Sequence, residues 1–314
     1  YFVNFMILGD HTNPVIESIG QGFSAVMPGS DPWTITTGWR YMFGSECVPA
    51  GLFTILICFV PESPRYLVMV GQDNKALSVL SRINGFSKAQ EIILEIKATL
   101  TTKTEKLFTY GFMCVFVGIM LSVFQQAVGI NAVLYYAPRI FADMGMGNPM
   151  MQTVIMGVIN ISFTLVAVFT VEKIGRKPLL IWGSIGMAVG AFVVALTFGN
   201  DSLNLVTMIS LMVYSASFMF SWGPICWVYM AELFPNTIRG TATAIAVAFQ
   251  WIFNFIVSSS FVPMFNMHLT KGDDFGHWFT YGLYGVICVI AAIFVWKLVP
   301  ETKGKTLEDM TALW

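Results

Sequence analysis

The chain has 314 residues, of which 56% are hydrophobic and 11% are charged, and its formal net charge is −1 at pH 7. Soluble domains carry about a quarter charged residues, so this composition excludes an ordinary soluble protein and indicates one embedded in a lipid bilayer. The near-zero net charge argues neither for nor against nucleic acid.

Long apolar runs recur along the chain, and a membrane-spanning helix needs about 20 predominantly apolar residues. Residues 1–8 are too short, and the chain begins without methionine, so we expect it to have lost its N-terminal part. A polar loop follows at 9–40. Full spans are then predicted at 41–60, 108–141, 151–171, 178–198, 204–228, 241–262 and 278–297.

One long polar stretch, residues 61–107, separates the spans. Leu77, Leu80 and Ile83 recur there at helical spacing, which predicts short amphipathic helices. The predicted organisation is a remnant of an N-terminal helical bundle at 1–60, a cytoplasmic linker at 61–107, and a six-helix transmembrane bundle with a short tail at 108–314. The predicted fold class is an all-α membrane protein.

The basic residues are distributed unevenly between the two sides of this topology. Fourteen of the 17 lysines and arginines fall in the loops at 61–107, 172–177 and 229–240 or at the C-terminus. Cytoplasmic loops carry such an excess. We therefore expect a multi-pass protein of the cell inner membrane with these loops and the C-terminus in the cytoplasm.

The predicted span at 108–141 is unusually polar near its middle. It contains Gln125, Gln126 and Asn131, and buried carboxamides in a bilayer need hydrogen-bond partners. On a straight helix Gln126 and Asn131 lie about 500° apart, so they converge only if the helix bends near Gly129. The interpretations are a site for a polar, uncharged ligand or hydrogen bonding between helices.

Opposite charges also mark the predicted cytoplasmic ends of several spans. Glu172 and Arg176 lie in the loop VEKIGRKP, while AELFPNTIRG places Glu232 at the end of one span and Arg239 at the start of the next. Such charges can latch neighbouring helices on one side of the membrane, as an alternating-access gate requires. The alternative is a simple positively charged membrane anchor.

Together these segments resemble the sugar porter branch of the major facilitator superfamily: PESPR, FQQAVGINAVLYYAP, VEKIGRKP, SWGPICWV, AELFPNTIRG, AFQW and PETKGKTLEDM. GWRYMFGSEC and SWGPICWVYMAELFPNTIRG are most similar to bacterial D-xylose–proton symporters. The resemblance implies two six-helix bundles joined by a helical linker. The chain would then supply the complete C-terminal bundle and only part of the N-terminal one.

The resemblance also implies a sugar-binding site and two gates. The positions matching the sugar-binding motifs are Gln125, Gln126, Asn131, Asn160, Phe218, Gly223, Trp227, Gln250 and Trp251. Tyr135 and Tyr136 resemble outer-gate tyrosines, and the cytoplasmic gate would use the four charged residues Glu172, Arg176, Glu232 and Arg239. Carboxamides suit sugar hydroxyls because both groups donate and accept, and aromatic rings suit the C–H face of a sugar. A core role for the tryptophans and a structural bond for Asn160 are the alternatives.

Proton coupling depends on a carboxyl group inside the membrane. Glu46 is the acidic residue within the predicted span at 41–60, and an intramembrane acid is a functional candidate by default. A structural, hydrogen-bonded glutamate is the alternative. Without coupling, the same protein would be a sugar uniporter.

The expected function is uptake of a pentose or hexose, D-xylose in particular, by proton symport. The expected partners are a small neutral sugar, a proton and the lipid bilayer, with no nucleic acid, and the protein is expected to be a monomer. No cofactor or metal is expected, because the five cysteines lie within apolar runs and lack metal-ligand spacing. A non-transporting sugar sensor and an inactive fragment are alternatives. An enzyme is not expected, because no acid–base pair is apparent at one membrane face.

Overall fold

The computed structural model describes residues 39–100, 107–145, 149–198, 203–235, 237–268 and 275–304. Within these ranges the regular structure is entirely helical. The chain divides into two compact units, Tyr1–Thr104 and Glu105–Trp314. The predicted remnant at 1–8, most of the loop at 9–40 and the tail beyond residue 304 lie outside the described residues.

The first unit contains the predicted span at 41–60 and the predicted linker. Two helices, α3 (Trp39–Ser45) and α4 (Cys47–Ile57), replace the single span, and Glu46 lies at the turn between them. The apolar helical stretch runs from 43 to 57 and is therefore shorter than the spans of the second unit.

Three short helices form the rest of the described part of the first unit: α5 (Pro64–Met69), α6 (Asp73–Asn84) and α7 (Phe86–Leu100). They have a small core of their own, in which Ala76 and Leu80 of α6 pack with Ala89 and Ile93 of α7. The apolar positions of these helices therefore lie together on the faces that form this core.

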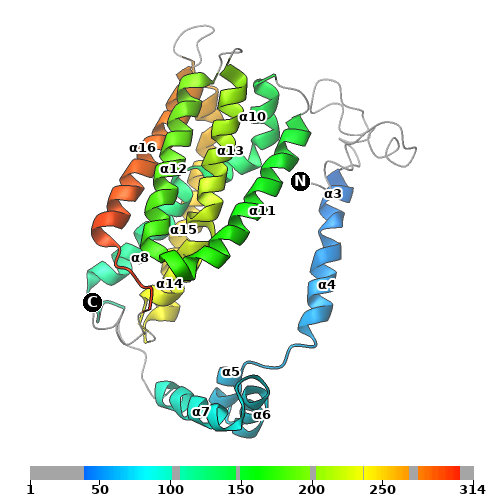
Figure 1. Cartoon of the computed structure of the whole chain (residues 1–314), viewed down its shortest axis with the longest axis vertical. Helices are drawn as coiled ribbons and strands as arrows, with labels where there is room; N and C mark the ends of the chain where they lie inside the picture. The colour runs from blue at the N-terminus through cyan, green and yellow to red at the C-terminus, as the bar shows by residue number, and fades with distance from the viewer. Residues whose placement is uncertain are drawn as a thin grey trace. The chain divides into compact units, whose positions relative to one another are not determined.

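The described part of the second unit is a bundle of six helical spans (Figure 1). Three of the spans are single unbroken helices: α11 (Pro149–Ile174), α12 (Arg176–Thr197) and α16 (Phe275–Leu298). A fourth, α15 (Arg239–Phe265), contains Pro263 near its end. The two remaining spans are broken into α8 (Phe112–Ala127) with α9 (Ile130–Tyr135), and α13 (Asn204–Phe220) with α14 (Trp222–Leu233). The short helix α10 (Ala137–Asp143) follows α9.

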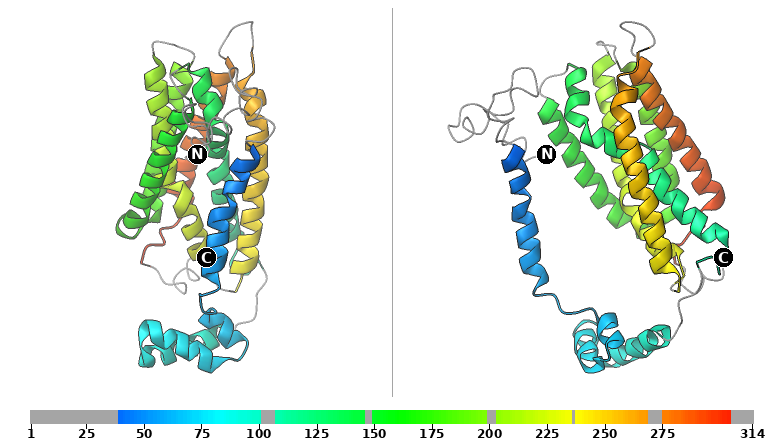
Figure 2. Two further views of the ribbon diagram at one scale, coloured as in Figure 1. Left: turned by 90° about the vertical axis from the view of Figure 1, so that its right-hand side faces the viewer. Right: turned by 180° about the vertical axis from the view of Figure 1, so that it is seen from behind.

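Small residues let α12 pack closely against α13. A Cβ atom at Gly190 of α12 would lie only 2.9 Å from the carbonyl oxygen of Ser210 on α13. The break between α13 and α14 at Ser221 lies against Gly183, also on α12. Close backbone approach through small residues is the usual means of packing helices within a bilayer. The resulting arrangement of α11, α12, α13 and α16 is visible from two further directions in Figure 2.

Large apolar side chains cover the outer faces of the bundle. Ile161 and Phe169 on α11 and Phe255 on α15 are each more than 60% exposed. Contiguous apolar exposure of this extent is unfavourable in water and favourable against lipid tails or another apolar bundle. The six spans therefore have the surface of transmembrane helices as well as the length.

Candidate functional site

The helix that carries the two glutamines is broken at Gly129. α8 ends at Ala127, Gly129 has a left-handed backbone with φ of +88°, and α9 begins at Ile130. Only glycine adopts this conformation without steric cost, which explains why the break occurs there. Across it, Nδ2 of Asn131 donates to Oε1 of Gln126 over 2.6 Å. The predicted convergence of these two residues through a bend at Gly129 is confirmed.

Helix α15 completes a buried network of carboxamides. Nε2 of Gln250 donates to Oε1 of Gln125 over 2.6 Å, and Nε2 of Gln126 donates to the same oxygen over 2.7 Å. Nδ2 of Asn254 donates to Oε1 of Gln126 over 3.0 Å. The network therefore links α8, α9 and α15, so the interhelical bonding considered for these residues is present.

These bonds leave much of the network's hydrogen-bonding capacity unused. A side-chain amide nitrogen carries two hydrogens. Four of the carboxamides each donate a single hydrogen bond in the described chain. The Oε1 atom of Gln250 is buried and has no hydrogen-bond partner among the described residues. Donors and an acceptor thus remain for a ligand with hydroxyl groups, which themselves donate and accept.

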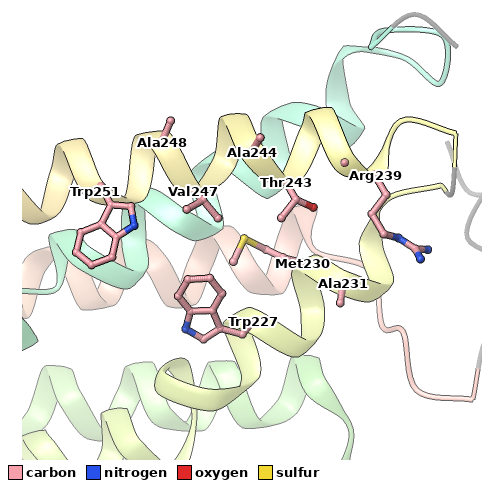
Figure 3. A pocket seen from close by; sticks show the side chains of 10 residues that line it. Trp227, Met230, Ala231, Arg239, Thr243, Ala244, Val247, Ala248 and Trp251 are labelled. Atoms are coloured by element: carbon pink, nitrogen blue, oxygen red, sulfur yellow. The ribbon is translucent and has the colours of Figure 1, made fainter. Parts of the chain in front are cut away.

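Two tryptophans line a cavity of about 770 Å³ between α14 and α15. Trp227 of α14 is 46% exposed and Trp251 of α15 is 63% exposed, so neither ring is part of the bundle core. Figure 3 shows the two indoles at one end of this cavity, with Met230 beside Trp227 and with Arg239 at the opposite end. Trp251 directly follows Gln250 of the carboxamide network.

The other predicted ligand and outer-gate residues occupy varied surroundings. Phe218 is buried and contacts Gly223 across the break at Ser221. Asn160 of α11 accepts a 2.7 Å hydrogen bond from Ser215 of α13, while its amide nitrogen has no partner among the described residues. Of the two tyrosines, Tyr135 is exposed at the end of α9, and Tyr136 stacks on Phe261 of α15 with ring centroids 5.2 Å apart.

Three of the four charged residues predicted for a gate meet where α11 ends and α12 begins. The guanidinium of Arg176 donates to Glu172 over 2.9 Å and to Glu232 of α14 over 2.6 Å. A second bond to Glu232, from Nε over 3.1 Å, makes this contact bidentate. Glu232 thus pairs with Arg176 rather than with Arg239, whose guanidinium donates to the carbonyl oxygen of Phe234.

The segment that follows α16 binds to this same cluster, a contact that was not predicted from the sequence. The carboxylate of Glu301 accepts the backbone N–H groups of Arg176 and Lys177, each over 3.0 Å. These N–H groups lie in the first turn of α12 and have no intrahelical acceptor, so the carboxylate caps the helix and complements its dipole. The hydroxyl of Thr302 donates to Glu232 over 2.6 Å. The PETKGK motif drew attention to this segment in the sequence, but it did not indicate which residues the segment contacts.

Residues 18–314 match the family described as "Sugar (and other) transporter". The chain belongs to this sugar transporter family.

Individual family members resemble the chain over most of its length. A D-xylose-proton symporter of Escherichia coli strain K12 is 48% identical over 291 residues, which cover 91% of this chain and 59% of the symporter. A glucose facilitated diffusion protein of Zymomonas mobilis is 37% identical over 91% of this chain and 62% of that protein. The chain thus spans about three fifths of the length of these family members.

A solved structure supports the fold assignment independently. The major facilitator superfamily proton:xylose symporter XylE, bound to 6-bromo-6-deoxy-D-glucose, matches with a TM-score of 0.79 and 47% sequence identity. The match covers 91% of this chain and 61% of that chain. The predicted fold class, an all-α membrane protein of the major facilitator superfamily, is confirmed.

Two further positions, Asn254 and Glu46, remain to be described. Asn254 was not among the predicted residues, although it lies four positions after Gln250 and therefore on the same helix face. Glu46 lies between α3 and α4 in the first unit, with an exposed side chain. In the described part of the chain, no group of three or more histidine, cysteine, aspartate or glutamate residues is placed to hold a metal ion.

Proposed function

We propose that the protein carries a neutral pentose or hexose, D-xylose in particular, across a membrane by alternating access. The observation that supports this most directly is the buried carboxamide network with unused donors and an unused acceptor. A sugar presents several hydroxyl groups at fixed angles, and a cluster of carboxamides on converging helices can bond several of them at once.

The chemistry of the network favours an uncharged ligand. The partners of its members in the described chain are other carboxamides, so all of these hydrogen bonds are between neutral groups. A carboxylate or phosphate ligand would be expected to meet a lysine or arginine instead. The ligand-binding residues we propose are Gln125, Gln126, Asn131, Asn160, Phe218, Gly223, Trp227, Gln250 and Trp251, together with Asn254.

We further propose that the charged cluster at the start of α12 is the cytoplasmic gate. Arg176 links α11 and α12 to α14, and the segment after α16 reinforces that link. A latch of this kind holds one side of a transporter closed and opens when the bundles rock. The excess of basic residues in these loops supports a cytoplasmic location for them and for the C-terminus, in a cell inner membrane. The exposed Tyr135 and the stacked Tyr136 would close the other side.

The energy source is proposed to be the proton gradient, with Glu46 as the coupling residue. The similar D-xylose-proton symporter supports this choice. The glucose facilitated diffusion protein supports uncoupled uniport as the second candidate, because its name describes movement without coupling. Both candidates share the sugar site and the gate, and neither requires an enzyme activity, a cofactor or a permanent partner protein.

A competition experiment tests the sugar directly. The purified protein is reconstituted in proteoliposomes, and uptake of labelled D-xylose is measured with and without an inward proton gradient. Excess unlabelled D-xylose, D-glucose and L-arabinose are added as competitors, and a sugar acid of similar size serves as the charged control. We expect competition by neutral sugars, none by the acid, and accumulation only with the gradient. Uptake that no neutral sugar inhibits would refute the proposal.

A further inference from the structure

The carbonyl group of Val128 lies at the point where the carboxamide-bearing helix breaks. It follows the last residue of α8, among the carbonyls that a helix end leaves without an intrahelical donor. The phenolic hydroxyl of Tyr214, on α13, donates a hydrogen bond to this oxygen. Tyr214 is 1% exposed, so water does not offer the carbonyl an easy substitute.

A second tyrosine lies against the same break but contributes differently. A Cβ atom built on Gly129 would lie 2.5 Å from the ring of Tyr284, so the ring packs directly on the glycine. The hydroxyl of Tyr284 is buried and has no hydrogen-bond partner among the described residues. The two tyrosines therefore surround one turn of backbone, but only Tyr214 bonds to it within the described chain.

The bond from Tyr214 acts on the geometry of the ligand site. Asn131 follows Val128 by three positions, and Asn131 reaches Gln126 because the helix breaks at Gly129 and α9 leaves α8 in a new direction. An unsatisfied carbonyl in a bilayer is unfavourable, so without the hydroxyl the backbone would seek another donor and the direction of α9 would change. Asn131 would then move away from Gln126.

We infer that Tyr214 is a positioning residue for the sugar, acting through the backbone of Val128 to hold Asn131 in its ligand-binding position. The inference rests on the proposed sugar-binding function. Tyr214 does not itself belong to the carboxamide network, and its hydroxyl is engaged by the Val128 carbonyl. Its contribution to binding is therefore expected to depend on Asn131.

The two tyrosines provide a matched pair of variants, since each loses only a buried hydroxyl on replacement by phenylalanine. Sugar affinity of the purified protein is measured by isothermal titration with D-xylose. Tyr214→Phe is expected to raise the Kd by roughly 5- to 10-fold, the effect of one lost hydrogen bond. Tyr284→Phe is expected to leave it within about 2-fold, since that hydroxyl has no described partner. Equal effects of the two replacements would overturn the inference.

A double-mutant cycle separates positioning from a general structural role. In an Asn131→Ala background, Tyr214→Phe is expected to cause no further loss of affinity, because the residue it positions is gone. A loss as large as in the native background would overturn the inference. The affinity of Gln126→Ala for D-xylose is measured alongside. If Gln126→Ala binds the sugar with native affinity, the proposed function fails. If Gln126→Ala loses affinity but Tyr214→Phe does not, only the inference about Tyr214 fails.

A further variant decides the case in which Tyr214→Phe does not fold. Replacing Tyr214 by p-aminophenylalanine keeps an N–H donor at the same position on a ring of the same size. If this variant folds and binds D-xylose with an affinity close to that of the native protein, the inference is supported, because the hydrogen bond is retained. A folded variant with an affinity weakened by 5-fold or more, on the order of one lost hydrogen bond, contradicts it.

Discussion

At the scale of single residues, Gln126 is the centre of the proposed sugar site. Its Oε1 accepts from both Asn131 and Asn254, and its Nε2 donates to Gln125. Gln126→Ala removes the group that aligns its three neighbours. We expect sugar affinity to fall by about 30-fold or more, the effect of losing more than one hydrogen bond. Titration of the purified variant with D-xylose measures this.

The same substitution elsewhere in the chain provides the control. Gln90 lies on the exposed face of α7, outside the bundle, and Gln90→Ala removes the same carboxamide. We expect native affinity from that variant. Gln126→Ala with native affinity would show that the carboxamide network serves only to join α8 and α15.

Some features of the carboxamide network could be predicted from the sequence and others could not. Gln125, Gln126 and Asn131 could be found because carboxamides inside an apolar run are costly and therefore conspicuous. Asn254 could also have been found, because it follows Gln250 by one helical turn. The pairing of Gln250 with Gln125 could not, since 125 positions separate them and no local pattern encodes which helix faces which.

At the scale of helices, the break between α8 and α9 depends on a single glycine. Gly129→Ala would introduce a Cβ both at a positive φ and within 2.5 Å of the Tyr284 ring. A non-glycine residue in the left-handed region costs about 1–3 kcal/mol in addition to the clash. We expect a lower melting temperature. We also expect at least 10-fold weaker sugar binding, because a strain energy of about this size corresponds to roughly a factor of ten or more in affinity.

Gly282, on α16, is the matched control for this change. A Cβ atom there meets nothing within 4 Å, and its backbone is an ordinary helix. Gly282→Ala should therefore preserve affinity and raise helix stability slightly. Thermal unfolding in detergent, with and without sugar, compares the two variants. Similar behaviour of both would mean that the break does not need a glycine.

The ion pairs at the start of α12 lead to a stability prediction. The side chain of Arg176 is 7% exposed and that of Glu232 is 28% exposed. Removing one partner of a fully buried pair costs about 3–5 kcal/mol. Because Glu172 is 72% exposed and can turn toward solvent, we expect Arg176→Ala to destabilise the protein by about 2 kcal/mol. Equilibrium unfolding measures this change.

The first unit contains an ion pair in a different environment for comparison. Lys97 and Asp73 are bonded but 49% and 41% exposed, and exposed pairs contribute about 0–1 kcal/mol. Lys97→Ala should thus have a much smaller effect than Arg176→Ala. Equally small losses of stability in Lys97→Ala and Arg176→Ala would show that the Arg176 cluster is as solvated as the exposed pair.

The sequence predicted which charges gather at helix ends but not how they pair. Glu232 and Arg239 are close in the chain, and that proximity suggested a latch between successive spans. In the folded protein Glu232 faces α12, where Arg176 offers two parallel N–H groups. Arg239 instead bonds to the carbonyl oxygen of Phe234. Partner choice depends on helix orientation, which is a property of packing rather than of spacing.

At the scale of the whole molecule, the order and number of spans in the bundle followed from apolar length alone. The constraint is physical, since a bilayer admits only segments that satisfy their own backbone hydrogen bonds. The break at Gly129 was predicted from the spacing of Gln126 and Asn131. The break at Ser221 was not predicted, because apolar composition continues through it. The reduced length of the helix at 43–57 was missed for the same reason: the run at 41–60 is apolar, but its helical part is shorter.

The proposed proton coupling involves the whole molecule, because the proposed carboxyl Glu46 and the carboxamide network belong to different units. Glu46→Gln keeps the size of the side chain but cannot exchange a proton. We expect this variant to lose accumulation of D-xylose driven by an inward proton gradient while it still exchanges labelled for unlabelled sugar at near-native rates. Counterflow and gradient-driven uptake in the same proteoliposomes measure the two activities. Glu62, which follows α4 in the same unit, provides the matched control, and Glu62→Gln should retain both gradient-driven accumulation and sugar exchange. Normal accumulation by Glu46→Gln would remove this residue from the mechanism, and a native protein that equilibrates but never accumulates sugar would identify a uniporter.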